Sequence, residues 1–76
     1  MQTRQIGEYE VEYGGEQIAE SQDWAAYVAV YGPSPNPMHR NSIFPHQRVE
    51  VESVFATEAE AADAALKAAS AMLAQN

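Results

Sequence analysis

The sequence predicts an α+β fold, in which a three-stranded antiparallel β-meander is followed by one C-terminal helix packed on one face of the sheet (β-β-β-α). Two segments, 6–13 and 47–55, alternate between polar and apolar residues, which is the period of half-buried strands. A third segment, 24–31, is uncharged and rich in aromatic and β-branched residues, which favour strands. The last segment has the alanine content of a helix. We expect a single small domain over residues 1–76.

The first predicted strand covers residues 6–13 and follows a polar start that we expect to be frayed. Its acidic residues occupy alternate positions: Glu8, Glu10 and Glu12. Gly14-Gly15 comes next, and two glycines supply the backbone freedom that a tight turn requires. Three interpretations of 16–23 stay open: a returning strand with a bulge, a polar loop, or a short helical turn. A strand or irregular arm is slightly favoured.

The second predicted strand, 24–31, is apolar on both faces, so we place it in the middle of the sheet. A helix ending at Gly32 is the competing interpretation, but the aromatic and β-branched content favours a strand. Alternate prolines then predict a long, extended loop over 32–46. Loops of this length in compact domains are usually functional or disordered. The third strand, 47–55, is expected to bury Val51 in the core.

The predicted helix covers residues 58–75 and begins with a capping box. The Thr57 hydroxyl is placed to accept from the backbone N–H of Glu60, whose carboxylate reaches back to the N–H of Thr57. One stripe of the helix is apolar, with small side chains that permit close packing: Ala62, Ala65, Leu66, Ala69, Met72 and Leu73. We therefore expect this stripe to face the sheet.

One helix on a three-stranded sheet leaves the other face open. That face is predicted to show apolar residues of the middle strand between two acidic rows, a pattern that marks an association surface. The candidate interaction surface combines acidic and aromatic residues: Glu8, Glu10, Glu12, Trp24, Tyr27, Tyr31, Glu50 and Glu52. Parity leaves open which half of 24–31 is exposed. Alternatively, the long loop folds over this face through Met38, Ile43 and Phe44.

The formal net charge of −7 excludes several classes of function. Phosphate-binding surfaces need clustered lysine and arginine, and this sequence has none, so we expect no direct nucleic-acid binding. The helix has acidic rather than basic residues on its polar stripe, so we expect no membrane binding. The start lacks the pattern of a secretory leader, and no apolar run reaches membrane-spanning length. We expect a cytoplasmic protein.

No group of residues predicts catalysis, a metal site or a cofactor. Alternating glutamates on edge strands are normally a solvated face that discourages aggregation. His39 and His46 are too few for a structural zinc site, because such sites use four ligands and the chain has no cysteine. We assign no catalytic, metal or cofactor-binding residues, and we expect no enzyme.

These observations predict a non-enzymatic interaction or accessory module that forms a homodimer, because small domains with half-covered sheets need extra burial. A first alternative is an acidic binder or inhibitor of a basic, nucleic-acid-binding protein surface. A second alternative is a small enzyme or ligand-binding protein with its site between the proline-rich loop and the sheet, using His39, His46 or Tyr31.

Overall fold

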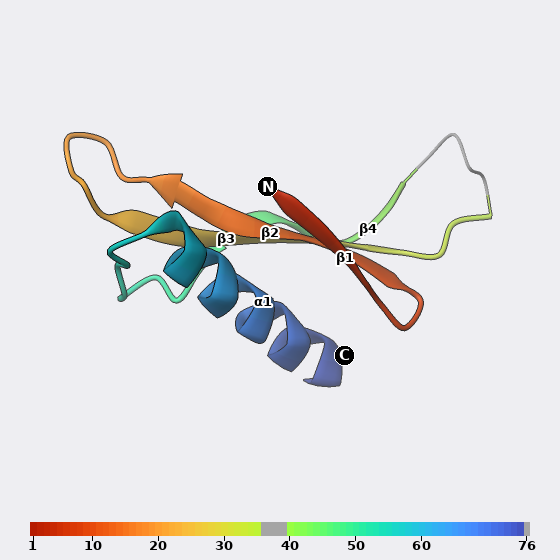
Figure 1. The fold of residues 1–76 in the computed structure, drawn as a ribbon. Coiled ribbons are helices and arrows are strands. Elements are labelled where there is room, and N and C mark those ends of the chain that lie inside the picture. Colours follow the sequence, from red (N-terminus) through yellow and green to blue (C-terminus); the bar gives the residue numbers. More distant parts are fainter. Residues whose placement is uncertain (36–39, 76) are drawn as a thin grey trace.

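The computed structural model describes residues 1–35 and 40–75, which form one antiparallel sheet and one helix (Figure 1). The elements in chain order are β1 (Gln2–Ile6), β2 (Tyr9–Gln17), β3 (Trp24–Gly32), β4 (Asn41–Val49) and α1 (Glu58–Gln75). The strand order in the sheet is β1-β2-β3-β4, so each strand pairs with the next one along the chain. The predicted antiparallel α+β meander with a C-terminal helix is confirmed, but it has four strands rather than three.

The fourth strand is β1, at the start of the chain where the sequence predicted a frayed end. Residues 6–13 are not one strand, because Gly7 and Glu8 form a two-residue turn and Ile6 pairs with Tyr9. Gly7 has φ of 59°, as the first central position of a type II′ hairpin turn requires. The segment resembled a single strand because Glu8, in the turn, continues the even-numbered row of Glu10 and Glu12. The pairing nevertheless places Ile6 on the face of Tyr9, so the alternation shifts by one residue across the turn.

Gly14 and Gly15 do not form the predicted turn; they lie inside β2, which continues to Gln17. A Cβ atom at Gly15 would lie 2.7 Å from the Cβ of Ala61 and 3.2 Å from the carbonyl oxygen of Glu58. Glycine at this position therefore lets the first turns of α1 approach the β2 backbone closely. Gly15 thus permits close packing between helix and sheet, and neither glycine reverses the chain.

The chain reverses instead after β2, in an irregular loop from Ile18 to Asp23. The N–H of Ile18 donates to the carbonyl oxygen of Asp23 at 2.9 Å, and the N–H of Ser21 donates to the carbonyl oxygen of Ile18 at 3.1 Å. Glu20 adopts a left-handed φ of 63°. Of the interpretations of 16–23, the loop is correct for 18–23, whereas Glu16 and Gln17 continue β2.

The last strand, β4, begins inside the segment predicted to be a loop and ends inside the predicted strand 47–55. Pro45 lies within β4, which is an edge strand with two register shifts against β3. Proline is tolerated there because an edge strand or a bulge leaves some backbone groups outside the ladder. Residues 36–39 of the predicted loop lie outside the described residues.

Beyond Val49 the predicted strand is wrong, because Glu50 has φ of 52° and a turn is closed by the N–H of Ser53 donating to Glu50. Val51, predicted to be core, is 64% exposed in this turn. Phe55 alone returns to the sheet, where it exchanges two backbone hydrogen bonds of 2.8 and 2.9 Å with Trp24. This bridge fixes the chain just before the helix begins.

The core lies between α1 and the central strands β2 and β3. Its buried members come from one face of the sheet and one stripe of the helix: Val11, Tyr13, Ala26, Val28, Val30, Ala62, Ala65 and Ala69. The structure thus shows which alternate side chains of β3 face the helix: those of Ala26, Val28 and Val30. Tyr27 and Tyr31, at the intervening positions, belong to the other face.

The predicted helix boundaries and the Thr57 cap are confirmed. Thr57 Oγ1 accepts from the backbone N–H of Glu60 at 3.1 Å. The Glu60 carboxylate reaches one residue further back than predicted and accepts from the N–H of Ala56 at 3.3 Å. Within residues 1–35 and 40–75, no helix is long and apolar enough to cross a membrane.

Candidate functional site

The sheet face opposite α1 gathers carboxylates, tyrosines and basic residues, and we call its mutually contacting members the carboxylate–tyrosine face. Arg48, the cross-strand partner of Tyr27, also lies at this face by register, but it donates to the carbonyl oxygen of Ser53. Because Val11 and Tyr13 of β2 point to the helix, the alternate positions of β2 point away from it. The members of the face are Glu10, Glu12 and Glu16 of β2, Tyr27 and Tyr31 of β3, Arg40, and His46 of β4. Three neighbouring segments therefore contribute to one surface.

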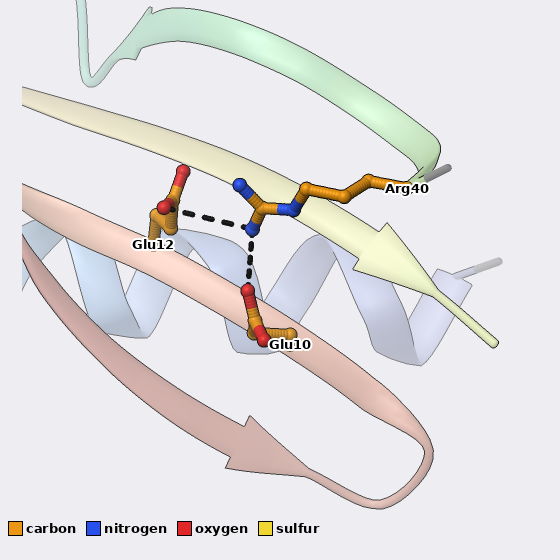
Figure 2. Close-up of polar contacts among 3 residues, drawn as sticks. All are labelled: Glu10, Glu12 and Arg40. Atoms are coloured by element: carbon orange, nitrogen blue, oxygen red, sulfur yellow. Dashed lines mark hydrogen bonds and ion pairs between the residues drawn. The ribbon is translucent and has the colours of Figure 1, made fainter. Parts of the chain in front are cut away.

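Arg40 lies across one half of this face (Figure 2). Its guanidinium carbon is 3.5 Å from the centroid of the Tyr31 ring, which is a cation–π contact. Its Nη2 atom donates to Glu10 Oε1 and lies 3.6 Å from Glu12 Oε2. Glu10 is the cross-strand partner of Tyr31, so the sheet register brings the carboxylate and the ring together. Two carboxylates and one aromatic ring thus hold one guanidinium.

His46 forms a second contact of the same kind further along β3. Its imidazole stacks on the ring of Tyr27, with centroids 5.0 Å apart and planes 11° from parallel. Its Nε2 atom lies 3.2 Å from Glu16 Oε2, an ion pair when the imidazole is protonated. His46 occupies the bulge of β4 between Gln47 and Phe44, and bulges characteristically re-aim side chains.

The contacts of Arg40 and His46 have the same arrangement: a basic side chain from the β4 side crosses a tyrosine of β3 and reaches a carboxylate of β2. Ala25 and Ala29 alternate with Tyr27 and Tyr31 on the same face of β3, and they are only 2% and 1% exposed. The open face is therefore covered in part by side chains of the protein itself. It is polar and charged where the sequence predicted an apolar strip.

Only four of the eight predicted surface residues come together on this face, namely Glu10, Glu12, Tyr27 and Tyr31. The other four lie elsewhere in the fold. Glu8 lies in the turn between β1 and β2, and Trp24 occupies a position on the helix side of β3, where it bridges to Phe55. Glu50 and Glu52 belong to the turn after β4.

Three residues of the face were absent from the predicted interaction surface, although His46 was named in the ligand-binding alternative. Glu16 continues the alternation of Glu10 and Glu12, a signal that was lost when Gly14-Gly15 was interpreted as a turn. Arg40 and His46 fell in the predicted loop, because the prolines around them concealed the strand. Ile43 and Phe44, expected to cover the open face, pack instead against the core. Met38 lies outside the described residues.

Among residues 1–35 and 40–75 there is no group of three or more histidine, cysteine or acidic side chains placed to hold a metal ion. His39 lies outside the described residues. Two surface hollows formed by described residues lie away from the face: one of about 470 Å³ at Gln17–Gln22, and one of about 370 Å³ between β4 and α1.

Comparison with known proteins gives no match: no family model, no curated protein and no solved structure is significantly similar to this chain. Its function has to be argued from the surface itself.

Proposed function

We propose that this protein is a non-enzymatic interaction module whose carboxylate–tyrosine face binds a basic segment of a partner protein. The observation that supports it is the guanidinium of Arg40, held by Tyr31 and by the carboxylates of Glu10 and Glu12. Carboxylates and aromatic faces are the groups by which proteins recognise arginine, through charged hydrogen bonds and stacking. The same groups are suited to a basic side chain from outside.

Charge supports the same proposal at longer range. A net charge of −7 attracts basic partners and raises their rate of encounter, and salt weakens this attraction. Glu10, Glu12 and Glu16 then provide local complementarity in one row along β2. A basic, nucleic-acid-binding protein surface is one partner of this chemistry.

Self-association is the second candidate, through a different surface. Two copies meeting through the carboxylate–tyrosine face would oppose equal rows of carboxylates, which is unfavourable. The hollow between β4 and α1 is better suited to a homodimer contact than the carboxylate–tyrosine face is, because apolar residues line it: Val49, Val51, Ala68 and Met72. Val51 is also exposed. An apolar contact of this kind persists at high salt, whereas basic-partner binding weakens.

The test is a titration of the protein with a fluorescent, arginine-containing basic peptide, followed by anisotropy at low and moderate salt. The double variant Glu10→Gln/Glu12→Gln removes two carboxylates from the face, and we expect it to weaken binding at least about tenfold. The matched control Glu8→Gln/Glu52→Gln makes the same change in net charge within two turns, and we expect less than about a twofold effect.

Equal losses in the two double variants would show that only overall charge matters and would overturn the assignment to this face. Absence of binding by the wild-type protein at low salt would overturn the function itself. Light scattering on the same samples tests the second candidate. A mass of two chains that is retained at high salt supports it, and a monomer under all conditions contradicts it.

A further inference from the structure

The carboxylate–tyrosine face is already occupied by two basic side chains of the same chain. Resting on the function proposed above, we propose that Arg40 and His46 are internal occupants of two arginine subsites. We further propose that the partner is an extended segment with two arginines four residues apart, which displaces them. The subsites are defined by Tyr31 with Glu10 and Glu12, and by Tyr27 with Glu16.

The chemistry of the first subsite suits a guanidinium better than an ammonium group. The guanidinium carbon lies 3.5 Å from the Tyr31 centroid, while one guanidinium nitrogen, Nη2, donates to Glu10 and lies 3.6 Å from Glu12 Oε2; a planar group can approach the ring this closely and still reach both carboxylates. Arginine presents several donors in one rigid plane, whereas the lysine ammonium is a compact and strongly hydrated charge. The second subsite likewise holds a planar group, the imidazole of His46, flat on Tyr27.

The internal occupants are held weakly enough to be replaced. The side chain of Arg40 is 51% exposed, and that of Glu10 is 44% exposed. His46 and Glu16 are about half exposed as well. Exposed ion pairs contribute little to stability, because water screens them and both side chains lose freedom. Displacement therefore costs the fold little, while it frees three carboxylates and two aromatic rings for a partner.

The spacing of the subsites indicates the conformation of the partner. Tyr27 and Tyr31 are four residues apart in β3, which corresponds to about 13 Å along a strand. An extended partner segment with arginines at positions i and i+4 presents both side chains on one side with the same separation. The same two positions of a helix are only about 6 Å apart along its axis. The face therefore fits an extended segment.

The experiment compares Arg40→Ala with Lys67→Ala, which makes the same change in net charge at an exposed position of α1. Each protein is titrated with a short unstructured peptide that carries arginines at i and i+4. We expect Arg40→Ala to bind it roughly threefold to fivefold more tightly than Lys67→Ala, because the first subsite is vacant and no internal contact has to be displaced. Equal affinities of the two variants would overturn the proposal.

Two further peptides test the partner's chemistry. One carries its arginines at i and i+3, which places them on opposite sides of an extended chain. The other carries lysines at i and i+4. We expect both to bind the Arg40→Ala variant at least about fivefold more weakly than the first peptide. Equal binding of all three peptides would show that only peptide charge is recognised, and would refute the arginine subsites.

Failure of this inference is distinguishable from failure of the proposed function. If Glu10→Gln/Glu12→Gln weakens binding but Arg40→Ala does not strengthen it, the face binds a partner without being self-occupied. If neither variant changes affinity, both proposals are wrong. Should Arg40→Ala fail to fold, as judged by circular dichroism, Arg40→Lys provides the test. It keeps the charge but loses the stacking, and we expect tighter peptide binding than for wild type.

Discussion

Replacing Gly15 by alanine tests how closely α1 lies on the sheet. The added Cβ would meet the Ala61 Cβ at 2.7 Å and the Glu58 carbonyl oxygen at 3.2 Å. The first distance is shorter than any ordinary contact between carbon atoms, and neither atom belongs to a flexible side-chain end. The first turns of α1 have to move away from β2.

The change in the free energy of unfolding for Gly15→Ala follows from two opposing effects. Overpacking of a tight contact costs about 1 to 3 kcal/mol. Alanine also restricts the unfolded chain, which returns about 0.5 to 1 kcal/mol where the backbone conformation suits it. We expect a net loss of about 1 to 2 kcal/mol in the free energy of unfolding, which corresponds to a fall of roughly 4 to 16 °C in the midpoint of a domain of this size.

Thermal unfolding followed by circular dichroism measures the effect, and the neighbouring Gly14→Ala is the matched control. Its Cβ would face the other side of β2, where the nearest atom is the Cα of Met1 at 3.3 Å, and Met1 is 59% exposed. We expect Gly14→Ala to be neutral or stabilising by up to about 1 kcal/mol. If Gly15→Ala is as stable as Gly14→Ala, the close approach of helix and strand is wrong.

The remaining predictions concern the cap and the turn after β4. Thr57→Ala removes the oxygen that accepts from the N–H of Glu60, and urea denaturation should show a loss of about 1 kcal/mol; an unchanged midpoint would mean that the cap contributes nothing. Val51→Asp places a charge on a side chain that is 64% exposed, so stability should change by less than about 0.5 kcal/mol. Unfolding of this variant would show that Val51 is core, as the alternation of 47–55 first suggested.

The sequence predicted the helix and the central strand well, because their local signals agree with their surroundings. Thr57 and Glu60 define the start of α1, and an uninterrupted run of good helix formers follows. Trp24 to Tyr31 lacks charge because β3 has a sheet neighbour on each edge and side chains packed over both faces. In both elements, composition and tertiary environment lead to the same conclusion.

The sequence failed where a residue has a role that depends on a distant segment. Gly15 is glycine because Ala61 packs against it, and no local pattern distinguishes this from a turn. Pro45 is compatible with β4 only because that strand lies at the sheet edge with a bulge. The carboxylate–tyrosine face was half predicted for the same reason: its carboxylates and tyrosines follow strand parity, but Arg40 and His46 reach it only through the bulged pairing of β4 with β3.

The central claim is that the sheet face opposite α1 recognises arginine. The most direct measurement is a titration of the ¹⁵N-labelled protein with the i, i+4 diarginine peptide, followed by backbone amide chemical shifts. Binding as proposed predicts that the largest changes fall on β2 and β3 around Glu10, Glu12, Tyr27 and Tyr31, together with Arg40. Changes confined to the outer surface of α1 and the turns, or spread evenly over all acidic residues, would contradict it.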